Sequence, residues 1–174
     1  MKQTNSILIF GTGWLGKKLG EYCNAELSGA DITDSASVCA ALDATRPSVV
    51  INAAGKTGRP NIDWCENHKE ETVHSNITGP FILLNACKER GIRLVHFSSG
   101  CIFDGASPAK NGFTEKDTPN PISFYAWTKA QADAVLSRFP TLIIRLRMPI
   151  DSMPHERNLI TKLANYSHII DAFK

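Results

Sequence analysis

The sequence predicts an α/β fold in which a doubly wound parallel sheet is covered by helices on both faces. Short apolar runs alternate along the chain with segments of helix length, as expected for repeated β-α-β units. The runs are continuously apolar, which is typical of strands buried on both faces of a parallel sheet. The chain has 174 residues, 43% of them hydrophobic, which is enough for one sizeable core but not for two full domains.

The predicted strands are the runs richest in aliphatic side chains. They cover residues 7–10, 49–51, 94–97 and 142–144. The interval between Cys23 and Asp31 is too short to predict a further strand with any force. The family of folds built from such units normally has a full strand at that place.

Helices are predicted over residues 14–23, 35–44 and 68–90, from Phe124 to just before Pro140, and over residues 159–170. Asp31 and Asp34 are candidate caps at the start of the second helix. A break is expected in the third helix near Gly79 and Pro80, because glycine weakens a helix interior and proline removes a donor. Residues 104–121 are rich in Gly, Pro, Asn and Lys and predict a long surface loop.

A glycine-rich segment follows the first predicted strand and reads G-T-G-W-L-G at residues 11–16. Gly11 permits the tight turn, Gly13 lets the backbone approach a pyrophosphate, and Gly16 lets the next helix pack closely on the sheet. The helix N-terminus adds free N–H groups and a positive dipole. The segment therefore predicts a Rossmann-type dinucleotide site, and the alternative for the spacing alone is a turn without a ligand.

A second chemical motif reads Y-A-W-T-K and places Tyr125 and Lys129 one helical turn apart on the same face. The cation is expected to lower the tyrosine pKa from its usual value of about 10, so that the phenol can exchange a proton near neutral pH. Ser99 ends the strand before it and can polarise the same substrate oxygen. The alternative is an amphipathic helix with a partly buried tyrosine and a solvated lysine.

Charge and cysteine content exclude several classes of function. The 19 basic and 17 acidic residues are interspersed and give a net charge of +2, so no nucleic-acid or membrane partner is expected. The five cysteines are scattered without a C-x-x-C pair, which argues against a disulfide framework and against a metal site. The first apolar stretch is too short for a signal segment or a membrane span. We expect a soluble, cytoplasmic protein.

Together with N-A-A-G at residues 52–55, these motifs resemble the extended short-chain dehydrogenase/reductase superfamily. The strings I-N-A-A-G-K-T, D-W-C-E, S-S-G-C-I-F, F-Y-A-W-T-K and R-N-L-I-T-K look like its sugar-nucleotide branch. Within that branch they resemble dTDP-4-dehydrorhamnose reductases and bifunctional nucleotide-4-keto-rhamnose 3,5-epimerase/4-reductases. The resemblance implies NADPH or NADH as cofactor and reduction of a dTDP- or UDP-linked 4-keto-6-deoxysugar.

The resemblance also implies roles for individual residues. Ser99 would polarise the ketone and Tyr125 would protonate O4. Lys129 would lower the tyrosine pKa and hold the nicotinamide ribose. Asn76 would brace the active-site helix, although an ordinary polar helix residue is an equal alternative. The implied cofactor-binding residues are Gly11, Gly13, Trp14, Leu15, Gly16, Asp31, Ile32, Asn52, Ala53, Ala54, Gly55, Tyr125 and Lys129.

Two residues match an epimerase pair in the bifunctional relatives. Cys101 would lie beside the sugar ring as an acid or base for inversion at C3 and C5, and Lys162 would be its partner. The alternatives are a small packed cysteine and a solvated lysine. Arg157 resembles a substrate-binding arginine, and a surface salt bridge explains it equally well. With Ser99 and Cys101, it completes the expected substrate contacts.

The chain departs from this family in two places. Asp31 aligns beside the adenine rather than on the ribose, so the choice between NADH and NADPH stays open. Residues 1–150 are expected to form the cofactor domain and residues 151–174 a helical remnant of the substrate-binding region, with the substrate lobe largely absent. Apolar surface around Met148 and Ile150 would then be uncovered, and a second copy or another chain is expected to cover it.

Two alternatives to this reductase remain open at the level of sequence. The domain could be a non-catalytic regulatory or assembly subunit that retains the cofactor fold. It could also reduce a smaller carbonyl substrate that needs no closing lobe. The intact Ser99, Tyr125 and Lys129 favour an enzyme.

Overall fold

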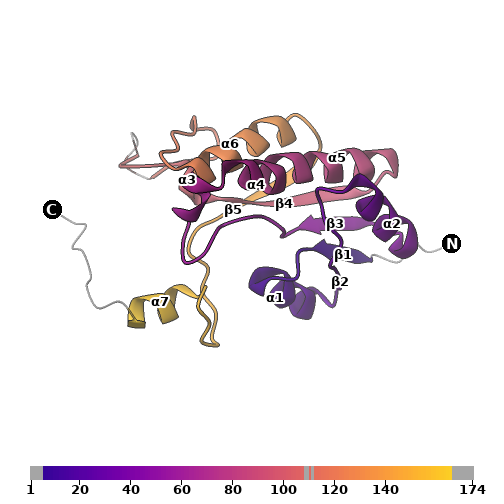
Figure 1. Cartoon of the computed structure of the whole chain (residues 1–174), viewed down its shortest axis with the longest axis horizontal. Coiled ribbons are helices and arrows are strands. Elements are labelled where there is room, and N and C mark those ends of the chain that lie inside the picture. Colours follow the sequence, from indigo (N-terminus) through magenta and orange to yellow (C-terminus); the bar gives the residue numbers. More distant parts are fainter. Residues whose placement is uncertain (1–5, 108–109, 111, 166–174) are drawn as a thin grey trace.

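A computed structural model describes residues 6–107, 110 and 112–165 of the chain. It contains one five-stranded parallel sheet in the order β2-β1-β3-β4-β5 (Figure 1). The strands are β1 (Ile7–Phe10), β2 (Glu26–Ser28), β3 (Val49–Asn52), β4 (Arg93–Ser99) and β5 (Thr141–Leu146). The strand order reverses between β1 and β3, which is where ligands bind in open α/β sheets. The predicted Rossmann-type architecture is confirmed.

Strand β2 shows that the sequence-based expectation for residues 23–31 was wrong. Asn24 ends the preceding helix in the left-handed conformation, with φ of 49°, and turns the chain at once. Glu26, Leu27 and Ser28 are therefore left to pair with β1. Gly20 permits the helix to approach, because a Cβ there would lie 3.1 Å from Leu27 Cδ2.

The helices are α1 (Trp14–Cys23), α2 (Ser35–Thr45), α3 (Trp64–Asn67), α4 (Lys69–Val73), α5 (Gly79–Glu89), α6 (Phe124–Leu136) and α7 (Leu159–Asn165), with a π-helix η1 (His74–Thr78) and a 3₁₀ turn η2 (Gly100–Ile102). Helices α2, α5 and α6 cover one face of the sheet, and α1 packs on the other face over β1 and β2 (Figure 1). Side chains cap several of these helices, among them α2 and α6. Asp34 accepts from Ala36 N at 3.0 Å, and Ser123 accepts from Ala126 N at 3.2 Å.

The expected break near Gly79 and Pro80 does not occur, because α4, η1 and α5 follow one another without a gap. Gly79 is required by packing, since a Cβ there would lie 2.5 Å from Ile32 Cδ1. Pro80 lies at the first positions of α5, where a missing N–H costs little. The π-helix widens the backbone in the turn just before it.

The core lies between the sheet and helices α2, α5 and α6. Its fully buried side chains include Leu8, Phe10, Val38, Leu42, Val50, Leu83 and Leu136. The opposite face of β5 is open, with Leu142 60% exposed. The predicted exposure of Met148 and Ile150 is confirmed at 49% and 66%.

The helix expected over residues 159–170 begins as predicted, and its part beyond Asn165 lies outside the described residues. No helix in the described part of the chain is both long enough and apolar enough to cross a membrane.

Candidate active site

The glycine-rich segment joins β1 to α1 at the point where the strand order reverses. Gly11 has φ of 109°, and a Cβ there would lie 2.6 Å from Ala54 N. A Cβ on Gly16 would overlap the carbonyl oxygen of Gly11, whereas a Cβ on Gly13 would meet nothing within 4 Å. Gly11 and Gly16 therefore close the turn, and Gly13 faces open space at the start of α1.

A cleft of about 910 Å³ opens at the carboxyl ends of the sheet strands, next to this turn. The predicted site residues that line it are Gly13, Trp14, Leu15, Ala53, Ala54, Gly55, Asn76, Ser99, Cys101, Tyr125, Lys129, Arg157 and Lys162. Residues separated by more than a hundred positions in the sequence are thus brought to one cavity. Asn52 lies beneath the cleft, fully buried, and accepts from Ala54 N at 3.0 Å.

Five of the predicted cofactor residues do not line this cleft: Gly11, Gly16 and Asn52, described above, and Asp31 and Ile32. The carboxylate of Asp31 accepts from the backbone N–H and the hydroxyl of Thr33, both at 2.8 Å. These hydrogen bonds lower the pKa of Asp31. Ile32 is 4% exposed and packs against Gly79 in the core. Their assignment as cofactor ligands stays a prediction.

The serine and tyrosine of the second motif are buried side by side at the floor of the cleft. Burial raises the pKa of Tyr125 to about 12, and its hydrogen bond with Ser99 opposes this shift. Ser99 also accepts from Cys101 N at 3.1 Å, which fixes the turn after β4. Tyr125 is therefore a protonated phenol at neutral pH, ready to donate.

Lys129 lies on the same helix but its amine is directed at β4. The Nζ donates to the carbonyl oxygen of Phe97 at 2.8 Å and lies 3.3 Å from Nε2 of His96. Burial lowers the pKa of Lys129 to about 8. The expected lowering of the Tyr125 pKa is not found, because burial outweighs every attractive contact of the phenol.

Asn76 connects the cofactor loop to the active-site helix. Its Oδ1 accepts from Lys56 N at 2.8 Å, and its Nδ2 donates to Lys56 O at 2.9 Å and to Thr128 Oγ1 at 3.2 Å. The side chain is fully buried in η1. Asn76 thus connects Lys56 to Thr128 of α6, and its role as a brace of the active site stays a prediction.

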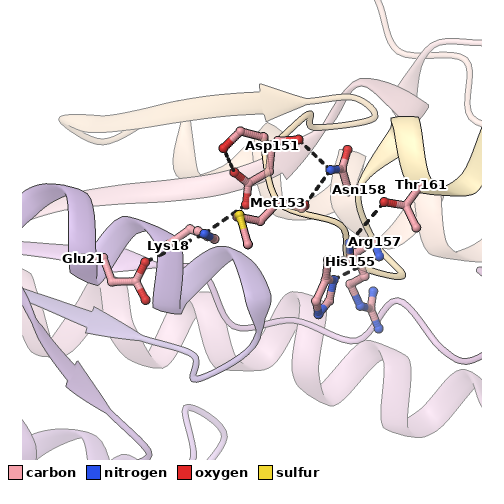
Figure 2. A network of polar contacts seen from close by, with 9 residues as sticks. Lys18, Glu21, Asp151, Met153, His155, Arg157, Asn158 and Thr161 are labelled. Atoms are coloured by element: carbon pink, nitrogen blue, oxygen red, sulfur yellow. Dashed lines mark hydrogen bonds and ion pairs between the residues drawn. The ribbon is translucent and has the colours of Figure 1, made fainter.

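Residues 147–162, here called the C-terminal strap, contribute side chains to the lining of the cleft. Figure 2 shows Asp151 reaching Lys18 of α1, at 3.1 Å between Oδ2 and Nζ. The ring of His155 stacks on Trp14 with centroids 5.2 Å apart. On the other side, Arg157 Nη1 donates to Thr57 Oγ1 at 2.6 Å. The strap therefore joins both walls of the cleft.

Hydrogen bonds within the strap also stabilise its conformation. Asn158 is 2% exposed and donates to the carbonyl oxygens of Asp151 and Met153, at 2.7 and 2.9 Å (Figure 2). His155 N donates to Thr161 Oγ1 at 3.1 Å. These bonds shape the turn that directs Arg157 and Lys162 into the cleft.

Three polar side chains at this site, those of His96, Ser98 and His155, were assigned no role from the sequence. His96 is a fully buried polar residue in the run R-L-V-H-F, and that break in an apolar strand was the available signal. Ser98 has a buried hydroxyl without a hydrogen-bond partner in the described part of the chain, and it lines the cleft. His155 gives no local signal, because only the tertiary fold brings it to Trp14.

Comparison with known proteins shows the class to which this fold and cleft belong. Residues 6–167 match the model of the RmlD substrate binding domain, so the chain belongs to this family. It is 42% identical to the bifunctional dTDP-4-dehydrorhamnose 3,5-epimerase/dTDP-4-dehydrorhamnose reductase of Arabidopsis thaliana, over 95% of this chain and 60% of that protein. The chain thus spans about 60% of the length of this relative.

Solved structures agree with this assignment. The UDP-rhamnose synthase of Acanthamoeba polyphaga mimivirus superposes with a TM-score of 0.84 at 32% identity, covering 94% of this chain and 63% of that one. A dTDP-4-dehydrorhamnose reductase from Clostridium acetobutylicum superposes with a TM-score of 0.76 at 28% identity, covering 92% and 58%. The Bacillus anthracis enzyme of the same name was solved with NADP, and it superposes with a TM-score of 0.72 at 25% identity, covering 82% and 53%.

Proposed function

We propose that this chain carries the reductase site of an NADPH-dependent enzyme acting on a nucleotide-linked 4-keto-6-deoxysugar of the dTDP- or UDP-4-keto-rhamnose type. The observation that carries the proposal is one cleft lined both by the glycine turn and by Ser99, Tyr125 and Lys129. The relatives named above are reductases and rhamnose synthases of such sugars.

The residues present fit a dinucleotide. Gly13 leaves open space at the N-terminus of α1, and no side chain caps that helix, so its N–H groups can receive a pyrophosphate. The Ser98 hydroxyl, which has no hydrogen-bond partner among the described residues, offers a further hydrogen bond within the cleft. A bound reduced nicotinamide would supply the hydride for the ketone carbon.

The roles of the protein groups follow from their protonation. Ser99 would donate a hydrogen bond to the ketone oxygen and polarise the carbonyl. Tyr125, protonated at neutral pH because its pKa is raised to about 12, would transfer its proton to that oxygen as hydride arrives. The site therefore favours the direction of reduction, in which the tyrosine must begin as an acid.

NADPH is the proposed form of the cofactor. An acidic residue at the end of the second strand is typical of NAD sites, because it binds the ribose diol. Here β2 ends at Ser28, followed by Gly29 and Ala30, and none of these carries a carboxylate. The solved structure from Bacillus anthracis contains NADP. Titration with both cofactors tests this choice, and tighter binding of NADH would contradict it.

A 3,5-epimerase activity is proposed as a second function of the same cleft. Cys101 and Lys162 both line the cavity, as an acid and base flanking a sugar must. The Arabidopsis relative is named for both activities.

Substitution of the cysteine separates the two activities. Cys101→Ala should stop solvent deuterium from entering at C3 and C5, while reduction of a ketone already inverted continues. The measurement is mass spectrometry of the product formed in deuterium oxide. Equal deuterium incorporation by Cys101→Ala and wild-type protein would exclude this role of the thiol.

The experiment for the main proposal is a cofactor titration followed by addition of a UDP- or dTDP-4-keto-6-deoxysugar. Ketone-dependent loss of the reduced-nicotinamide absorbance supports a reductase. Cofactor binding without oxidation would instead favour the non-catalytic alternative. Oxidation by simple ketones alone would favour a smaller substrate.

The exposed side chains near the C-terminal strap support a covering partner, a second copy or another chain. Ile160 and Leu163 of α7 are 53% and 44% exposed, and Met148 and Ile150 are exposed as well. Sedimentation of the purified protein at several concentrations tests for self-association. A monomer at every concentration would exclude the second copy.

A further inference from the structure

A row of buried polar side chains runs behind the cleft, from β3 across β4 to α6. Asn52 and His96 are register partners on the two strands and are both fully buried, and Lys129 is 4% exposed. Nδ2 of Asn52 lies 3.1 Å from Nδ1 of His96, and Nε2 of His96 lies 3.3 Å from Nζ of Lys129. Three polar groups buried together must satisfy one another, because water does not reach them.

The backbone at both ends of the row fixes the direction of its hydrogen bonds. The N–H of Ala54 can only donate, so its 3.0 Å contact makes Oδ1 of Asn52 an acceptor and turns the Nδ2 amide toward His96. Nδ1 of His96 must then accept. At the other end, Nζ of Lys129 donates to the carbonyl of Phe97, which can only accept.

The tautomer of His96 follows from this direction. A neutral imidazole that accepts at Nδ1 carries its proton at Nε2, and this proton points at the Lys129 amine. The row is complete only when that amine offers a lone pair, that is, when Lys129 is neutral. A protonated Lys129 would face His96 donor to donor.

We propose that Asn52 and His96 are positioning residues that favour the neutral amine of Lys129 over its ammonium form, through an Nε2-protonated histidine. The charged groups around Lys129 fit this assignment. Burial lowers the pKa of His96 well below its usual value, so the imidazole stays neutral beside either form of Lys129. Asp133, one turn along α6, raises the Lys129 pKa, but its carboxylate is already bound by Arg145 of β5 at 2.9 Å.

The consequence for catalysis rests on the proposed function. Transfer of the Tyr125 proton to the sugar oxygen leaves a phenolate that must be reprotonated. A lysine with a pKa of about 8 can release its proton for this purpose and regain one from solvent. His96 would stabilise the neutral amine that remains, because its Nε2–H then finds an acceptor.

The first test needs no cofactor or substrate. Long-range ¹⁵N NMR of wild-type protein at pH 9 should show His96 protonated at Nε2 with Nδ1 bare, and a ¹³C,¹⁵N-lysine titration should place the Lys129 midpoint near 8. Lys129→Arg assigns the lysine signal. A proton on Nδ1, or a midpoint at the ordinary value of about 10.5, would overturn the proposal.

The second test changes the histidine. In His96→Gln the amide oxygen can accept from an ammonium, so the Lys129 midpoint should rise by about one unit, a tenfold gain in proton affinity. Asn52→Asp should shift it in the same direction, because a carboxylate reverses the His96 tautomer. His74→Gln makes the same substitution at an exposed position of η1 and should leave the midpoint unchanged. An unchanged midpoint in folded His96→Gln would refute the assignment.

Both tests use the cofactor-free protein. They therefore remain valid even if the protein reduces no sugar, and absence of turnover would count against the proposed function alone.

Discussion

The floor of the cleft and the C-terminal strap contain the same kinds of polar residue but are held in opposite ways. On the floor, Asn76, His96 and Lys129 are buried and each is fixed by two or more hydrogen bonds to other elements. In the strap, the Lys18–Asp151 pair joins side chains 40% and 18% exposed. The Arg59–Glu156 pair is more exposed still, at 79% and 62%.

The floor is therefore held by buried hydrogen bonds, whereas these contacts of the strap are exposed ion pairs. Buried hydrogen bonds are costly to break because the partner left behind cannot reach water. Exposed ion pairs contribute little because water and salt compete with them. The floor should therefore tolerate almost no change, whereas the strap should tolerate many.

The largest effect is expected where the backbone itself leaves no room. Gly16→Ala would place a methyl group on the carbonyl of Gly11 and should lower the free energy of unfolding by about 3 kcal/mol or more. The control is Gly29→Ala, where a Cβ meets nothing within 4 Å. Urea unfolding of both variants measures the difference, and equal midpoints would contradict the close packing of this turn.

Gly13→Val probes the same turn on its open side. The valine has space in the free protein, so stability should hold, but it would fill the proposed pyrophosphate site and abolish cofactor binding. Calorimetric titration with NADPH measures this. Normal binding by the variant would show that the cofactor lies elsewhere.

Loss of the proton donor is the next largest effect. Tyr125→Phe should reduce turnover by a factor of about 10² to 10⁴, the usual contribution of general acid catalysis, with cofactor affinity nearly unchanged. The matched control on the same helix is Trp127→Phe, because Trp127 is 41% exposed. Turnover by Tyr125→Phe at the wild-type rate would contradict the assignment of the acid.

The buried amine predicts a smaller effect that depends on pH. The pKa of Lys129 is about 8 in the folded protein and about 10.5 when unfolded. Between these values the unfolded chain binds more protons, so stability rises with pH from 8 toward 10.5, by at most about 3 kcal/mol. Lys129→Met removes the group, and the difference between the two unfolding curves isolates it. Parallel curves across this window would contradict the lowered pKa.

The smallest effect is expected in the strap. Asp151→Asn removes the ion pair with Lys18 and should change stability by no more than about 1 kcal/mol. Cofactor affinity should fall only a few-fold, because the stacking of His155 on Trp14 and the bond from Arg157 to Thr57 remain. Thermal unfolding and NADPH titration measure both. Complete loss of cofactor binding would show that the strap is as important for binding as the floor, which would contradict the comparison.

The sheet could be predicted from the sequence because buried parallel strands are recognisable as continuous apolar runs. Each of the predicted strands is present, and the dinucleotide turn lies where its glycines indicate. Strand β2 was missed because two of its three residues, Glu26 and Ser28, are polar and none of the three is buried, so only pairing with β1 makes them a strand.

The residues of the site could be identified from the sequence, but the neighbours that surround them in the fold could not. Tyr125 and Lys129 share a helix face, as their spacing predicts, yet the neighbour that determines the lysine environment is His96, from a strand more than thirty positions away. No local pattern encodes that contact. The strap is a similar case, since Arg157 finds Thr57 a hundred positions earlier in the chain.

Isotope transfer tests most directly whether a sugar ketone bound at the floor of the cleft receives hydride from the nicotinamide cofactor. The purified protein would be incubated separately with 4R- and with 4S-deuterated NADPH and a UDP- or dTDP-4-keto-rhamnose, and the product would be analysed by mass spectrometry and NMR. We predict that one of the two labelled cofactors gives one deuterium at C4 of the product sugar with wild-type protein, and that Tyr125→Phe gives at least about a hundredfold less in the same time. Bound cofactor with no deuterium transferred from either label by the wild-type protein would contradict this prediction.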